Sequence, residues 1–402
     1  MSTPLMWWQL PLLALLCAAC VPEGGADDPD PVMLDDEGGV MAGTMGAGGT
    51  APMGGVPAAG GQMVPGGAMA EGGQMAPGGV MAPGGVMAPG GVMAPGGMME
   101  PGEPVLVDPD CVDGQWREAL PTRDAPLDEP LGNYSANEVN SFVLDVLSRR
   151  YALGHYIVDR ALAEGVFGDC IGIFLRDTGS GQAVIGQLST VVHECGHSAD
   201  LGASGFSDAT FLLTEDIDFT CSGGDTTSRG GQTFARSRIR NDAYSALRAP
   251  CDGNFGIDCD HYADIYLDGD PDDGNFEGGD QGFNSVLEET TQYVNSLATG
   301  LAFVDFYANS RSERDGILTF LWYVMRYLRM ARLEYPEGYA RIAGDACWRQ
   351  AILSVWGRAW LYLDATDGMR NLGISDGELF GLVNDPDLLG EIARIRAAEG
   401  CR

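Results

Sequence analysis

A low-complexity stretch limits what this chain of 402 residues can fold into. The unit GGVMAP occurs three times in succession, at residues 78–83, 84–89 and 90–95, and degenerate copies begin near Gly48. Paired glycines and regularly spaced prolines prevent a helix and discourage a strand. We therefore expect residues 20–104 to form a disordered tether, which leaves residues 105–402 for the folded domain.

The residues before this tether predict export. Residues 10–19 form an apolar run that is too short to span a bilayer but typical of a signal peptide. The run ends in Cys17-Ala18-Ala19-Cys20, and small residues before a cysteine resemble the bacterial lipoprotein signal. That resemblance implies a signal peptide at residues 1–19, a lipid on Cys20 and a place in the cell envelope, at the outer membrane or cell surface. Ordinary cleavage after Ala19 is the alternative.

The charge balance excludes some partners. The chain has 23 basic residues, all of them arginine, against 57 acidic residues, of which ten precede residue 105 and 47 follow it. An acidic body lacks the positive footprint that binds nucleic acid. It also lacks the basic patch that binds anionic lipid, so we expect membrane contact through the lipid anchor only.

Hydrophobic periodicity predicts an α+β domain, with a small sheet early and a mainly helical C-terminal lobe. A capping box at Ser135 and Glu138 opens a helical pattern toward residue 162. Strands are expected at residues 170–175 and 211–219. Further helices are expected at residues 182–200, 283–307, 313–333, 338–363, 376–383 and 386–398.

Cysteine usage predicts disulfides. Of the ten cysteines, Cys17 leaves with the signal peptide and Cys20 is the lipid site, so eight stay in the folded part. An even number in an exported chain indicates disulfide bonds. Two candidate pairings are Cys251 with Cys259 and Cys347 with Cys401, although sequence does not fix the connectivity.

The expected helix at residues 182–200 contains the motif H-E-x-x-H, as His193-Glu194-Cys195-Gly196-His197. Positions i and i+4 lie on one face of a helix, so His193 and His197 can both bind one Zn²⁺. Glu194 then lies beside the metal-bound water, where it can accept a proton. Apolar residues precede the motif, and burying these polar side chains without a metal would be costly.

A catalytic zinc needs a third protein ligand. His155 and His261 lie in unrelated contexts, and no third histidine follows His197 at the metzincin spacing. Residues 287–295, LEETTQYVN, resemble the second zinc helix of the gluzincins, in the alanyl-aminopeptidase-like branch. In that motif a glutamate ligand precedes a tyrosine by five residues, as Glu288 precedes Tyr293.

The choice between Glu288 and Glu289 also depends on which side of the helix is polar. Glu289 shares its side with Val286 and Tyr293, whereas Glu288 shares its side with Thr291, Gln292 and Asn295. A polar side suits a hydrated metal site, which favours Glu288 and leaves Glu289 as the alternative. Asp200, three residues after His197 on the same helix, is a weaker rival.

The resemblance implies a zincin-like metallopeptidase domain at residues 105–402, with one zinc ion held by His193, His197 and Glu288. Glu194 would activate the zinc-bound water for hydrolysis of a peptide or protein substrate. Tyr293, Tyr323 or Tyr327 would donate a hydrogen bond to the oxyanion. The alternative is a non-catalytic surface lipoprotein that uses a zincin-like fold for binding or as an envelope scaffold.

A second metal site is suggested by an acidic loop at residues 268–280. Alternating aspartates in a glycine-rich loop suit Ca²⁺. The EF-hand spacing is not met, because Asp273 stands where glycine is required and no glutamate stands at the twelfth position. A polar surface loop is the alternative, and nearby His261 and Asp264 are expected to be ordinary structural residues.

Overall fold

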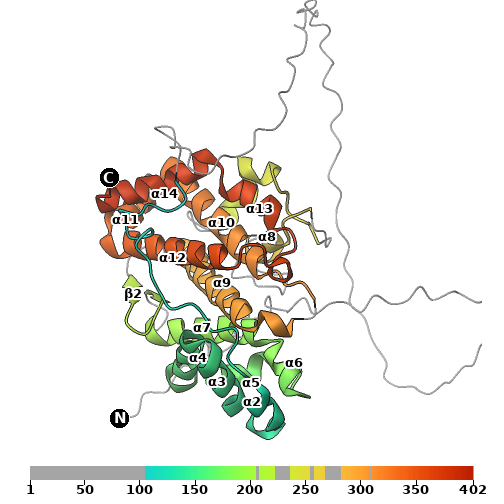
Figure 1. Cartoon of the computed structure of the whole chain (residues 1–402). Helices are drawn as coiled ribbons and strands as arrows, with labels where there is room; N and C mark the ends of the chain where they lie inside the picture. The colour runs from blue at the N-terminus through green and yellow to red at the C-terminus, as the bar shows by residue number, and fades with distance from the viewer. Residues whose placement is uncertain are drawn as a thin grey trace, which may run out of the picture. The chain divides into compact units, whose positions relative to one another are not determined.

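The computed structural model describes residues 105–204, 208–221, 236–253, 258–267, 282–307 and 309–401, which are mostly helical with one small sheet (Figure 1). This composition agrees with the expected α+β class at a coarse level. The signal peptide, Cys20, the tether and the acidic loop at residues 268–280 lie outside the described residues. Within the described ranges, no helix is both long enough and apolar enough to cross a membrane.

The first helices carry the apolar face that the sequence predicts. Phe142, Val143, Val146 and Leu147 are all buried on helix α3. The pattern expected to run on toward residue 162 is divided into two helices at Tyr151. The elements as far as the H-E-x-x-H motif are α2 (Asp128–Gly132), η1 (Ala136–Glu138), α3 (Val139–Arg150), α4 (Ala152–Glu164), α5 (Cys170–Phe174), α6 (Gly181–Ile185) and α7 (Leu188–Ser204).

The strand expected at residues 170–175 is wrong, because these residues form the short helix α5. The side chain of Asp169 caps this helix by accepting a hydrogen bond of 3.0 Å from the backbone N–H of Gly172. Cys170, its first residue, is bonded to Cys195 on α7. A short apolar run does not distinguish a strand from a buried helix. Here the helix is capped by Asp169 and bonded to α7 through the disulfide.

The sheet is a hairpin in place of the single strand expected at residues 211–219. Strand β1 (Ala209–Leu212) pairs antiparallel with β2 (Asp218–Cys221). β1 is buried throughout and packs on α7 and α9, whereas β2 is largely exposed. Asp200, near the end of α7, accepts a hydrogen bond of 3.1 Å from the backbone N–H of Leu212, which fixes the hairpin against that helix.

From Phe283 onward the described chain is mainly helical, as expected, whereas the short helices η2, η3 and α8 before it were not predicted. Helix α9 is buried along most of its length and packs against α7, α10, α12 and β1, so it forms the centre of the structure (Figure 1). The helix expected at residues 338–363 is two helices, separated at Asp345. These elements are η2 (Arg236–Ile239), η3 (Ala243–Ala246), α8 (His261–Tyr266), α9 (Phe283–Phe303), η4 (Val304–Phe306), α10 (Glu313–Glu334), α11 (Pro336–Gly344), α12 (Ala346–Ala365), η5 (Arg370–Leu372), α13 (Asp376–Val383) and α14 (Pro386–Glu399).

Four disulfides connect the eight cysteines of the folded part. The suggested pairing of Cys251 with Cys259 is present. The suggested pairing of Cys347 with Cys401 is not, because each of these cysteines has a different partner. The other three bonds are Cys111–Cys401, Cys170–Cys195 and Cys221–Cys347.

Candidate metal centre

Helix α7 presents two histidines side by side. His193 and His197 are one turn apart, their ring centroids are 4.8 Å apart, and they are only 2% and 5% exposed. The apolar residues Val191 and Val192 are fully buried just before the motif. The expectation of a buried helix that carries both histidines on one face is therefore confirmed, although the single helix expected at residues 182–200 is two helices, α6 and α7.

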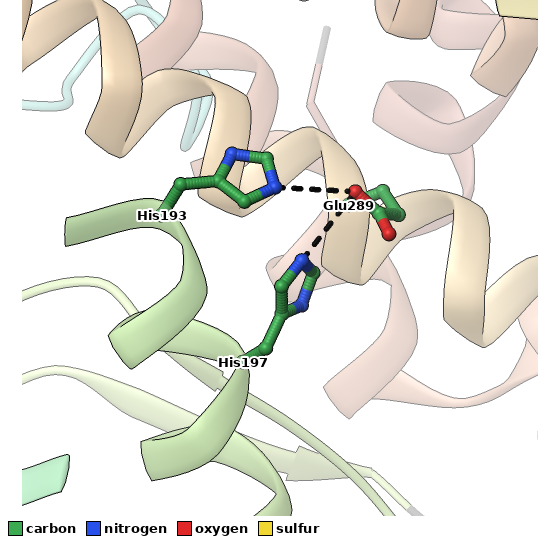
Figure 2. A group of neighbouring side chains, drawn as sticks. All are labelled: His193, His197 and Glu289. Atoms are coloured by element: carbon green, nitrogen blue, oxygen red, sulfur yellow. Dashed lines mark ion pairs between the residues drawn. The ribbon is translucent and has the colours of Figure 1, made fainter. Parts of the chain in front are cut away.

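Helix α9 brings a carboxylate to the two histidines. The Oε2 atom of Glu289 lies 3.5 Å from Nε2 of His193 and 3.5 Å from Nε2 of His197. The three atoms all lie within 4.8 Å of one another, and all three residues are buried. Figure 2 shows the rings and the carboxylate pointing toward one common point between α7 and α9.

The unsatisfied atoms at this point fit a metal ion. Among the described residues, Nε2 of His193, Nε2 of His197 and Oε2 of Glu289 are buried without a hydrogen-bond partner. Buried polar atoms are normally paired, because an unpaired one loses its hydration without compensation. Two imidazole nitrogens and one carboxylate oxygen that converge in this way form a three-ligand site for a divalent cation.

The Nδ1 atom of each histidine ring has a hydrogen-bond partner on α9. Nδ1 of His193 is 3.0 Å from the hydroxyl of Ser296, and Nδ1 of His197 is 2.9 and 2.7 Å from the carboxylate oxygens of Glu288. A carboxylate accepts a hydrogen bond from Nδ1–H, and that leaves the Nε2 lone pair for a metal. The two rings are thus oriented before any ion binds.

The structure places Glu288 differently from the sequence expectation. Its carboxylate bonds to the outer nitrogen of His197, and Glu289 occupies the position expected for Glu288. The error lies in the assumption that the polar side of α9 faces the metal. That polar side instead forms a hydrogen-bonded layer behind His197, which includes Gln292 and Asn295.

The metal-facing side of α9 consists of Glu289, Tyr293 and Ser296, at spacings of four and three residues along the helix. Each of these residues contacts one or both histidines. Asp200 is not part of the centre, since its carboxylate accepts hydrogen bonds from Leu212 and Gln292. Ser296 is a residue that the sequence analysis missed, although its spacing from Glu289 would have indicated it.

Without a metal, proton binding balances the charges of the centre. Burial opposes the charged form of His197, but Glu288 and Glu289 outweigh this effect and raise its pKa well above the usual value. Burial alone would raise the pKa of Glu289, but the charge of His197 lowers it below its usual range. The pKa values of His197 and Glu289 therefore shift in opposite directions because the imidazole and the carboxylate attract each other in the metal-free site.

The other residues of the motif have separate positions. Glu194 is fully buried on α7, directly after His193. Cys195 is in the disulfide with Cys170, so it offers no thiolate to a metal. His261 stacks on Tyr262 with ring centroids 4.3 Å apart, and Asp264 pairs with Arg240 at 2.8 Å. Neither belongs to the metal-ligand group among the described residues.

Of the three tyrosines considered, the structure brings one to the centre. The ring of Tyr293 meets the ring of His193 edge to face at 4.9 Å between centroids, and it is only partly buried. Tyr323 is fully buried and donates a hydrogen bond of 2.7 Å to Asp260. Tyr327 is fully buried and packs on Phe283. Tyr293 is thus the tyrosine next to the metal ligands.

Comparison of the chain with protein-family models, with curated proteins and with solved structures finds no match. The resemblance to the gluzincins therefore depends on the two motif-bearing helices α7 and α9. The cluster of His193, His197 and Glu289 is the structural feature on which a function can be argued.

Proposed function

We propose that the chain is a zinc-dependent metallopeptidase of gluzincin type. The observation that carries this proposal is the convergence of Nε2 of His193, Nε2 of His197 and Oε2 of Glu289, which come from an H-E-x-x-H helix and a second helix. A two-histidine, one-carboxylate set is the ligand set of catalytic zinc sites that keep a position open for water or substrate.

Zinc, when bound, supplies a Lewis acid that polarises the substrate carbonyl and makes a water molecule easier to deprotonate. Glu194 would be the base for that water, because it directly follows His193 on α7, its carboxylate is buried and it is not one of the converging ligands. It then passes the proton to the leaving amine. Tyr293, whose ring contacts His193 and whose hydroxyl lies 3.4 Å from that of Tyr266, would donate a hydrogen bond to the developing oxyanion.

The proposed place of action is the cell envelope. A signal peptide at residues 1–19 and a lipid on Cys20 would anchor the chain, and residues 20–104 would space the catalytic part from the membrane. The substrates are then peptides or proteins outside the cytoplasm. The four disulfides support this location, since such bonds persist in oxidising compartments.

The test is hydrolysis of a broad peptide library by the purified protein, with and without a chelator, together with its metal content. Glu194→Gln should lower hydrolysis by on the order of 10²–10⁴-fold and leave the bound zinc unchanged, because Glu194 moves a proton but is not a ligand. Glu164→Gln is the matched control: this exposed glutamate lies 3.8 Å from Arg160 on the surface of α4.

Undiminished hydrolysis by the Glu194→Gln protein would refute the proposed mechanism. One equivalent of bound zinc with no cleavage of any peptide would favour the alternative, a surface lipoprotein that uses the fold for binding or as a scaffold.

A further inference from the structure

A series of buried and partly buried hydrogen bonds connects the candidate metal centre to helix α12. Glu288 is bonded to Nδ1 of His197 at 2.7 Å, and the side-chain N–H of Gln292 donates to Glu288 at 2.9 Å. The side-chain N–H of Asn295 donates to Gln292 at 2.8 Å. Arg358 donates to Asn295 at 2.8 Å. The chain therefore leads from a guanidinium on α12, along one side of α9, to an imidazole on α7.

The donor and acceptor roles along these hydrogen bonds are fixed at both ends, because Arg358 can only donate and the carboxylates of Glu288 and Asp200 both accept from Gln292. A guanidinium has donors and no acceptor, so Asn295 must present its side-chain oxygen to Arg358 and its NH₂ to Gln292. Gln292 accepts through its oxygen, and its NH₂ then donates to Glu288. With this orientation the Glu288 carboxylate is left to accept from Nδ1–H of His197, and Nε2 keeps its lone pair for the metal.

The guanidinium of Arg358 is held in one position by burial and by two further hydrogen bonds. It is fully buried, and its Nε donates to Glu118 at 2.7 Å while one Nη donates to the hydroxyl of Tyr151 at 3.0 Å. These partners lie in different parts of the chain: Glu118 before α2, Tyr151 between α3 and α4, and Asn295 on α9. A buried ion pair adds little net stability compared with apolar packing, so stability alone does not account for a charge at this place.

We infer that Arg358 is a positioning residue of the metal centre, which acts through Asn295, Gln292 and Glu288 to orient His197 and fix its tautomer. The inference rests on the metal centre of the proposed function and not on peptide hydrolysis. It implies that side chains on α12 and α9, none of which is a ligand, contribute to metal affinity.

The experiment interrupts the series of hydrogen bonds at Asn295. Asn295→Leu removes both amide groups at similar volume and leaves Arg358 with Glu118 and Tyr151. The zinc dissociation constant of the full chain is measured by competition with a chelating indicator, and the visible spectrum of the Co²⁺-loaded protein reports the ligand geometry. We expect zinc affinity to fall on the order of 10–100-fold, as for other losses behind a metal ligand, and the Co²⁺ bands to shift.

Thr299→Val is the matched control on the same helix. The hydroxyl of Thr299 is fully buried and donates to the backbone oxygen of Asn295 at 2.8 Å, but it lies outside the chain of side chains. This variant should keep the zinc affinity and the Co²⁺ spectrum. Arg358→Met should reproduce the effect of Asn295→Leu, and Arg358→Lys should restore part of the affinity, because an ammonium also donates and never accepts.

Zinc affinity and Co²⁺ bands that are unchanged in the Asn295→Leu protein would overturn the inference. So would an equal loss in the Thr299→Val protein, which would indicate general loosening of α9. If the unaltered protein binds zinc but cleaves no peptide, the proposed function fails and the inference is still tested by these affinities. If the unaltered protein binds no divalent metal, both are refuted.

Discussion

Gly196, the residue before the second histidine of the motif, should not tolerate a side chain. A Cβ atom built on it would lie 1.9 Å from the side-chain oxygen and 2.7 Å from the side-chain carbon Cδ of Gln292. Real Cβ atoms do not approach other atoms so closely, so Gly196→Ala must push the Gln292 side chain away. That side chain is the link between Asn295 and Glu288.

The cost can be worked out from the contacts of Gln292. It donates hydrogen bonds of 2.9 Å to Glu288 and 2.9 Å to Asp200 and accepts one of 2.8 Å from Asn295; the bond to Glu288 is partly buried and the other two are buried. Each such bond contributes about 0.5–1.5 kcal/mol net, and overpacking costs about 1–3 kcal/mol. Alanine regains about 1 kcal/mol of helix propensity over glycine. We expect Gly196→Ala to lower the free energy of unfolding by about 2–5 kcal/mol.

The assay is urea unfolding of the metal-free protein, followed by zinc titration of the folded variant. Gly381→Ala on α13 is the matched control, since nothing lies within 4 Å of a Cβ added there. That change should raise the free energy of unfolding by about 0.5–1 kcal/mol. In a Gln292→Ala background, Gly196→Ala should lose most of its cost, because the obstructing side chain is gone.

The reasoning is refuted if Gly196→Ala is as stable as the unaltered protein and binds zinc equally well. It is also refuted if the cost of Gly196→Ala is the same with and without Gln292, because the clash would then lie elsewhere.

Three further predictions follow from other residues. Glu289→Ala should weaken zinc binding more than Glu288→Ala, because Glu289 provides a ligand oxygen and Glu288 only orients His197; the opposite order in a competition titration would contradict the site. Burial raises the pKa of Glu313 from 4.5 to about 7, so the folded state holds this proton more tightly than the unfolded state. Stability should therefore fall as pH rises between these two values, by about 3 kcal/mol; Glu313→Gln should flatten this dependence in urea unfolding at several pH values, and an unchanged slope would exclude Glu313 as its source. Cys20→Ala should release the protein from membranes into the soluble fraction, and a variant that stays fully processed and membrane-bound would disprove the lipid anchor.

The sequence predicted the two histidines of the candidate metal centre, and the structure places Glu289 with them where the sequence favoured Glu288. The i, i+4 spacing of His193 and His197 fixes their common face, whatever surrounds the helix. The choice between Glu288 and Glu289 depended on which side of α9 faces α7. Both sides carry polar residues. The side with Glu288, Gln292 and Asn295 forms hydrogen bonds that end at Arg358, on a helix far along the sequence. No local pattern shows that partner.

The errors in local structure have a similar cause. Residues 170–175 are apolar and short, which suits a strand or a buried helix equally well. In the structure these residues form a helix, which Asp169 caps and which the disulfide from Cys170 to Cys195 ties to α7. The disulfide is a tertiary contact, so no local pattern predicts it. The partners of Cys347 and Cys401 are likewise distant in sequence, at separations of 126 and 290 residues. The helices expected at residues 313–333, 376–383 and 386–398 were predicted well because their periodicity is local, whereas the break at Asp345 was not.

The disulfide between Cys170 and Cys195 also bears on the order in which the parts of the candidate centre come together. It closes a short loop, with a sequence separation of 25, and so costs little chain entropy. If the chain is exported as proposed, its N-terminal side reaches the oxidising compartment first, so this bond can close before α9 arrives there. Two imidazoles on one helix hold a metal weakly, and Glu289 arrives only with α9. On the proposed function, zinc would bind only after α9 has docked, and a chain with this bond closed and no zinc bound is the intermediate that a pulse-labelling experiment should detect.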